Sequence, residues 1–229
     1  MSTNTLPSFF KKYFEGLTLS PALFYSWKYS IRFEISDPLI SSHEKDCLNQ
    51  AFHRSITSFQ RVFGERDEIL FVTDVHTTNK DRFLQKRPLK VYLKYIKDKQ
   101  RLYQLNHHCL PSVFQDEDED DDQSLTHRFV LSCKKTELRY AQLLKAINYE
   151  DFAHPSTILK SNSQSSYDIY FINLSKKMIF HLYDDRGCDV LASSKESIRF
   201  LYEEYNNWIL DYDREEIDLL FKWKVGFIH

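Results

Sequence analysis

The hydrophobic positions of the chain change period several times, and each period predicts an element. Residues 29–36 alternate between apolar and polar side chains, the pattern of a half-buried strand, so we expect residues 22–36 to be extended. Residues 48–63 carry apolar side chains at helical spacing and predict a long helix that ends at Gly64. The same reasoning predicts helices over 6–17 and 138–147 and strands over 69–75 and 127–133. Residues 105–115 show no period and are expected to be irregular.

The C-terminal part of the pattern, residues 167–221, predicts the unit around which the rest of the chain packs. Residues 167–174 and 178–183 are apolar in both alternating sets, which is typical of central strands covered on both faces. Short turns at 175–177 and 184–187 and a strand at 190–192 complete a β-meander. Ser193 and Glu196 then predict a capping box, which opens a helix that runs to Ile209. Within this unit we expect structural roles for Gly187, Tyr205 and Trp208.

These elements predict an α+β fold, a mixture of helices and strands. We expect one mixed or largely antiparallel sheet of about six strands, flanked by helices and ending in the β-meander and a long capped helix. A length of 229 residues with 42% hydrophobic residues suits a single globular domain over residues 1–229.

The cysteines and the N-terminus bear on the compartment. Cys47, Cys109, Cys133 and Cys188 form no CxxC pair and are expected to be free thiols. The N-terminus lacks the pattern of a signal peptide, and no window approaches the about 20 apolar residues of a membrane span. We therefore expect a cytoplasmic protein with no membrane contact.

Charge is unevenly distributed, although the net charge is only −2. Residues 116–122 are all acidic and predict a solvated loop over 115–124, while residues 79–101 contain nine basic and two acidic residues. The candidate basic surface consists of Lys86, Arg87, Lys90, Lys94 and Lys97. It is interpreted either as a solvated amphipathic helix or as a nucleic-acid site, which the acidic loop would screen if it folded back.

Asp184, Asp185 and Arg186 form a candidate functional turn. Two carboxylates beside a guanidinium suit a metal ion or a phosphate. The alternative is a structural hairpin turn, in which Arg186 pairs with Asp211 or Asp213 and Gly187 supplies a positive φ. Turn chemistry alone accounts for the Asp and Gly residues, so the structural interpretation is favoured.

Other candidate chemistry is weaker. The spacing of the His and Cys residues does not match a zinc site, and we expect ordinary loop and strand residues at His107, His108, Cys109, His127 and Cys133. His181 is expected to be a buried histidine with satisfied hydrogen bonds. The chain has four glycines and none of the common nucleotide-binding or catalytic motifs, so we expect no metal and no cofactor.

The sequence Tyr-Asp-Asp-Arg-Gly at 183–187, followed by a capped helix with Tyr-Asn at 205–206 and Asp-Arg-Glu at 213–215, resembles a C-terminal signature. The signature is that of a bacterial domain-of-unknown-function family, whose members are mostly uncharacterised proteins of Gram-positive bacteria. The resemblance covers residues 170–220 and implies a bacterial cytosolic origin. It brings no established activity, and the acidic run is not expected of the family.

Three functional hypotheses follow. The leading one is a non-catalytic protein-binding module, of the immunity or antitoxin kind, with a protein partner of unknown identity. The alternative is a nucleic-acid-binding protein that uses residues 80–101. A weaker alternative is an enzyme that uses the turn from Asp184 to Arg186, although the absence of a catalytic set favours a non-enzymatic role.

Overall fold

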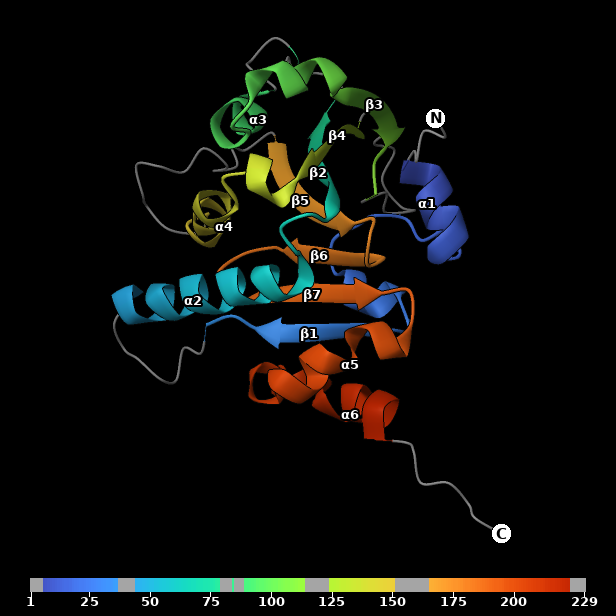
Figure 1. Cartoon of the computed structure of the whole chain (residues 1–229), viewed down its shortest axis with the longest axis vertical. Coiled ribbons are helices and arrows are strands. Elements are labelled where there is room, and N and C mark those ends of the chain that lie inside the picture. The colour runs from blue at the N-terminus through green and yellow to red at the C-terminus, as the bar shows by residue number, and fades with distance from the viewer. Residues whose placement is uncertain are drawn as a thin grey trace.

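The fold is built on one seven-stranded sheet, in which all pairings are antiparallel and the strand order is β1-β7-β6-β5-β2-β4-β3 (Figure 1). The computed structural model describes residues 6–36, 44–78, 84, 89–113, 124–150 and 165–222. The strands are β1 (Ser30–Glu34), β2 (Glu68–Thr78), β3 (Asn106–Pro111), β4 (Ser124–Lys134), β5 (Ser165–Asn173), β6 (Met178–Leu182) and β7 (Gly187–Ala192). The α-helices are α1 (Leu6–Tyr13), α2 (Glu44–Val62), α3 (Lys90–Tyr95), α4 (Tyr140–Asn148), α5 (Lys195–Glu204) and α6 (Arg214–Lys222). Short 3-10 helices are η1 (Leu23–Ser26), η3 (Lys99–Gln104), η4 (Lys135–Glu137), η5 (Asn206–Trp208) and η6 (Asp211–Asp213).

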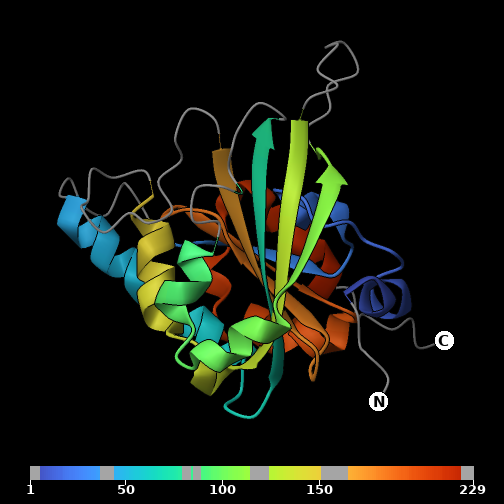
Figure 2. The ribbon, with the colours of Figure 1, turned by 90° about the horizontal axis from the view of Figure 1, so that it is seen from above.

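Strands β5, β6 and β7 lie next to one another in chain order and form the predicted β-meander. Both faces of these strands are buried. One face packs against α2 and α4, and the other is covered by α1 and the segment that follows it (Figure 2). The α+β class and the doubly covered central strands are therefore confirmed.

Aromatic rings fill the larger of the two cores. Phe59 of α2 lies 4.4 Å from Phe63, 5.0 Å from Phe171 and 5.6 Å from Phe180, measured between ring centroids. Phe171 also stacks on Phe71 of the neighbouring strand β2 at 5.4 Å. These contacts explain the apolar stripe of α2, because that stripe lies directly on the central strands.

The sheet has seven strands rather than about six, because residues 106–111 form β3. This segment was expected to be irregular. Most of its side chains are exposed, so the strand has no buried face that would impose an alternating pattern. Its pairing with β4, which joins His107 to Phe129 in register, holds it in the sheet.

The prediction of an extended, half-buried segment over 22–36 is only partly right. Residues 23–26 form η1, and the strand is limited to β1, whose polar face is buried as well. The Ser30 hydroxyl bonds to the carbonyl oxygens of Phe24 and Trp27, at 2.9 and 2.7 Å. Arg32 donates through Nε to the buried Asp189, at 3.0 Å. Polar side chains therefore occupy this face because they have partners there.

The prediction of one long helix after β7 is wrong at both ends. Its N-cap is Ser194 rather than Ser193, with the Ser194 hydroxyl accepting from the Ser197 N–H at 3.3 Å. Helix α5 ends at Glu204, and the chain then turns through η5 to lie along β1. There the Leu210 N–H donates to the Arg32 carbonyl at 3.3 Å. Pairing with the open edge of β1 replaces further helical turns.

Candidate nucleic-acid interface

Two segments that are far apart in the chain form a basic surface at one end of the molecule. The Arg139 N–H donates to the Tyr95 carbonyl at 2.8 Å, and the Lys97 N–H donates to the Glu137 carbonyl at 2.9 Å. An isolated antiparallel bridge joins Ile96 to Leu138 between them. These backbone contacts place the end of α3 directly beside the start of α4, and so bring Arg139 next to Lys97.

Buried tyrosines fix α3 to the sheet. The Tyr92 hydroxyl donates to the Phe129 carbonyl at 2.9 Å, and its ring centroid lies 4.7 Å from that of Phe71. Burial raises the pKa of Tyr92 well above its ordinary range and raises the pKa of Tyr95 to about 12, so both stay neutral. Val91, Tyr92 and Tyr95 therefore form the buried side of α3, while Lys94 faces solvent.

The basic surface, as used below, consists of four exposed residues: Lys94, Lys97, Lys99 and Arg139. The Lys97 ammonium donates to the Thr136 carbonyl at 2.7 Å, and Lys99 donates to the carbonyl oxygens of Leu93 and Ile96. Such contacts fix the side chains without neutralising their charge.

The acidic residues within residues 89–105 and 135–142 are Asp98 and Glu137. Glu137 accepts from Arg101 at 2.7 and 2.9 Å, so its charge is already balanced within the surface. A net positive potential follows.

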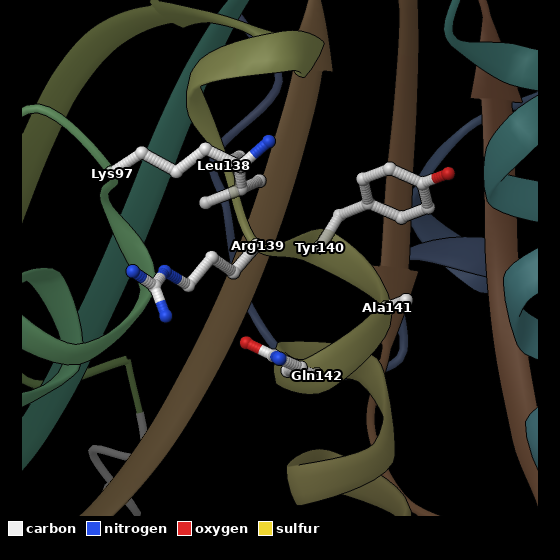
Figure 3. Close-up of a pocket in the computed structure, with 6 residues that line it drawn as sticks. All are labelled: Lys97, Leu138, Arg139, Tyr140, Ala141 and Gln142. Carbon is white, nitrogen blue, oxygen red and sulfur yellow. The ribbon is translucent and has the colours of Figure 1, made fainter.

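A cavity of about 370 Å³ lies beside two residues of this surface, Lys97 and Arg139 (Figure 3). It is lined by Lys97, Leu138, Arg139, Tyr140, Ala141 and Gln142. Lys97 and Arg139 lie on one side of it, whereas Tyr140 points the other way and accepts from the Gln60 amide at 2.9 Å. The start of α4 contributes the positive end of a helix dipole at the same place. The cavity is therefore suited to an anionic group.

Three of the five residues of the predicted basic surface, Lys90, Lys94 and Lys97, lie within the described residues. Lys94 and Lys97 are exposed as the prediction requires. Lys90 is only partly exposed, its ammonium lies 5.2 Å from the centre of the Tyr167 ring, and burial lowers its pKa. Lys86, Arg87 and the acidic run 116–122 lie outside the described residues. Arg139 was missed, because only tertiary packing brings it to this surface.

The predicted functional turn is held by contacts within itself. The Asp184 carboxylate accepts from the backbone N–H groups of Arg186 and Gly187, at 2.8 and 3.2 Å. It also accepts from the Arg186 guanidinium, with 2.7 Å to Nε. Asp185 accepts from the Ser36 hydroxyl at 3.4 Å. These contacts suit a structural hairpin turn.

Two details of the structural interpretation of the turn are wrong. Arg186 pairs within the turn, whereas Asp211 accepts from Arg214 at 3.0 Å and Asp213 from Arg32 at 3.4 Å. Gly187 has no positive φ. A Cβ at Gly187 would instead lie 2.2 Å from the Tyr183 hydroxyl oxygen, so the glycine is needed for a close approach of this ring.

A buried polar group, which no pattern in the sequence predicts, lies on the sheet face below α1. The two ring nitrogens of His76 lie 2.8 Å from the Asp168 carboxylate and 3.0 Å from the Thr126 hydroxyl. The order of carboxylate, imidazole and hydroxyl resembles the Asp-His-Ser triad of serine hydrolases. Thr126 is fully buried, however, so its hydroxyl is not accessible to a substrate in this structure. Burial alone would raise the pKa of Asp168, but the two imidazole rings beside it, those of His181 and His76, hold this pKa well below its usual range.

His181 departs from its prediction in one respect. It is fully buried as expected, and its Nε2 lies 3.4 Å from Asp168. Neither ring nitrogen, however, makes a hydrogen bond with the described residues, and the same holds for the buried Tyr170 hydroxyl beside it. Their ring centroids lie 4.3 Å apart, so packing rather than hydrogen bonding fixes this pair.

Two further points concern metal binding and membrane spans in the described residues. No group of three or more His, Cys, Asp or Glu side chains there is arranged to hold a metal ion. His107 and His127, considered above for zinc, lie 3.1 Å apart between ring nitrogens and stack at 5.2 Å. Within the same residues, no helix has both the length and the apolar character needed to cross a bilayer.

Comparisons with known proteins agree with the expected resemblance. Residues 6–213 match the model of a protein family described as a domain of unknown function, DUF3885. The chain is also 32% identical over 214 residues to the "Uncharacterized protein YnaE" of Bacillus subtilis (strain 168), an alignment that covers 90% of this chain and 98% of that protein. No solved structure matches the chain. With most of its length matched by the family model, the chain belongs to the DUF3885 family.

Proposed function

We propose that this protein binds nucleic acid through the basic surface. The observation that carries the proposal is that Lys97 and Arg139, which come from two different segments, line one cavity, and that Lys94 and Lys99, close to Lys97 in the chain, are exposed as well. If these lysines belonged only to the solvated face of a helix, a cation from a second segment would not be expected beside them. Phosphate groups are the anions that such an arrangement of Lys and Arg side chains binds in series.

The proposal makes a quantitative statement about salt. Each phosphate that a basic side chain neutralises releases counterions, which lowers log K by about 0.7 per tenfold rise in salt for a single strand. Four contacts would give a slope of about −3. A weak, non-specific association with one or two contacts would give a slope of about −1.

The test compares two triple variants by fluorescence anisotropy with a labelled oligonucleotide between about 50 and 200 mM salt. Lys94→Ala/Lys97→Ala/Arg139→Ala removes most of the basic surface. Lys11→Ala/Lys12→Ala/Lys28→Ala removes three exposed lysines from α1 and the segment after it, on the other side of the sheet. We expect the first triple variant to flatten the slope by about 2 and the second to leave it unchanged. Equal slopes in both variants, or no binding at low salt, would contradict the proposal.

A second candidate, a protein-binding module, is favoured by β3. This strand lies at the edge of the sheet and its only strand neighbour among the described residues is β4. It carries no Lys, Arg, Asp or Glu, although natural edge strands usually avoid pairing by such charges. An extended segment of a partner protein would add to the sheet here.

The two candidates separate in a co-purification from the native host. Strand addition would be favoured if the natural protein recovers a stoichiometric partner and the Cys109→Lys variant does not. A lysine on the edge strand β3 opposes pairing with a further strand. Recovery of no stoichiometric partner would count against it. Either role would be carried out in the cytoplasm, the compartment that four free cysteines favour.

A further inference from the structure

Tyr103 stands beside the basic surface with 94% of its area exposed. We infer that its ring is a stacking platform for an unpaired base, and that the protein therefore prefers single-stranded nucleic acid. This inference rests on the proposed function. It adds the class of ligand, since a ring that stacks on a base requires a base that is not already inside a duplex.

The segment that carries Tyr103 is held in place at several points. At its start, the Asp98 carboxylate accepts from the Gln100 N–H at 2.9 Å. In its middle, Arg101 is paired with Glu137. At its end, Leu105 donates to the Leu102 carbonyl at 3.2 Å, and both leucines pack against the core. The ring of Tyr103 is thus presented by an anchored turn.

The spacing between the ring and the cations suits a single strand. Tyr103 follows Lys99 by four residues in η3, which places the two about 8 Å apart along the helix axis. The Lys99 ammonium is itself tied to the end of α3, beside Lys94 and Lys97. A single strand of nucleic acid that contacts Lys99 would therefore place a base on the Tyr103 ring one or two nucleotides from that contact.

A second exposed ring lies just beyond Tyr103. His107, the second residue of β3, is exposed and stacks on Phe129 with ring centroids 4.6 Å apart. Aromatic and histidine rings on a sheet are a common support for unstacked bases. The two rings therefore come from consecutive segments, η3 and β3, and η3 also carries Lys99 of the basic surface.

The experiment measures the affinity of the full-length protein for three probes: single-stranded DNA, single-stranded RNA and a DNA duplex of the same sequence. Tyr103→Ala should weaken both single strands by about fivefold to a hundredfold and leave the duplex unchanged. Its salt slope should stay that of the natural protein, because no phosphate contact is lost. Tyr103→Trp should retain the affinity, and Tyr103→Leu, which keeps an apolar side chain without a ring, should behave like Tyr103→Ala.

The outcomes distinguish this inference from the proposed function. One outcome would overturn the stacking inference alone: the protein binds single strands and duplex with equal affinity, Tyr103→Ala changes neither affinity, and binding is still steeply salt-dependent. Absence of salt-dependent binding would overturn both. A Tyr103→Ala variant that loses a protein partner and keeps its affinity for nucleic acid would also overturn the inference and assign the ring to a protein interface. Because the Tyr103 side chain is exposed, each variant should keep the circular dichroism spectrum of the natural protein.

Discussion

Gly187→Ala is a small substitution for which the structure predicts a large effect. An ideal Cβ at this position lies 2.2 Å from Oη, 2.7 Å from Cζ and 2.9 Å from Cε2 of Tyr183. Ordinary carbon contacts begin near about 3.5 Å, so the ring must move by about 1 Å. It cannot move freely, because it packs edge-on against the buried His181 at 5.7 Å. The glycine is also fixed, since it begins β7 and pairs in register with Glu34 of β1.

Overpacking of this kind costs about 1–3 kcal/mol. The substitution also restricts the unfolded chain, which offsets about 0.4–1 kcal/mol of that cost. We therefore expect a net loss of about 1–2 kcal/mol in the free energy of unfolding. For a protein of this size, each kcal/mol lowers the melting temperature by about 2–4 °C. Urea unfolding, followed by tryptophan fluorescence, would measure the loss directly.

Two further variants make the reasoning refutable. Gly64→Ala is the matched control, because its Cβ would lie 3.2 Å from the Asp67 carboxylate, so that group would have to shift by only a few tenths of an ångström. Tyr183→Phe removes the closest atom, so Gly187→Ala should cost less in that background. A free energy of unfolding within about 0.5 kcal/mol of that of the natural protein would refute the steric explanation. An equal loss from Gly187→Ala with and without Tyr183→Phe would refute it as well.

Three further predictions concern stability. Asp168→Asn should lower the free energy of unfolding at pH 7 by about 1–3 kcal/mol, because the bond to His76 weakens. Since the pKa of Asp168 is lower in the folded protein, its contribution to the free energy of unfolding is present above about pH 4 and is lost as the pH falls toward the folded pKa. In urea titrations at a series of pH values, the variant should therefore lose less stability on acidification than the natural protein. Trp208→Ala should cost about 2 kcal/mol by loss of its stack on Tyr205 at 4.5 Å, seen as a lower melting temperature in calorimetry. Arg186→Ala should cost less than about 1 kcal/mol, because its side chain is 74% exposed; an unchanged melting temperature with a lost biological phenotype would contradict the structural role of the turn.

The elements that could be predicted from the sequence are those whose pattern reflects their own burial. Helix α2 shows a helical stripe because Phe59 and Val62 face the core, and most side chains of β5 and β6 are apolar because both faces of these strands are covered. Strand β3 could not be predicted, since its side chains are mostly exposed and leave no pattern. The end of α5 depends on β1, whose edge pairs with residue Leu210.

The candidate site was predictable only in part, for a similar reason. The lysines of α3 and its surroundings stand close together in the chain, so their charge is visible in the sequence. Arg139 joins them only through the bonds between residues 95–97 and 137–139. The polar group of His76, Thr126 and Asp168 could not be predicted, because each residue comes from a different strand and only the pairing of the strands brings the three together.

Hydrogen–deuterium exchange of the protein with and without a saturating single-stranded oligonucleotide would test the central claim most directly, because it locates the bound surface without any substitution. The account predicts added protection in residues 93–105 and 137–142, which contain the basic surface and Tyr103. The turn at 184–187 and the segment around α1 should exchange at the same rate in both states. Protection confined to β3, to the 184–187 turn or to α1, with none at residues 93–105, would contradict the claim that this surface binds nucleic acid.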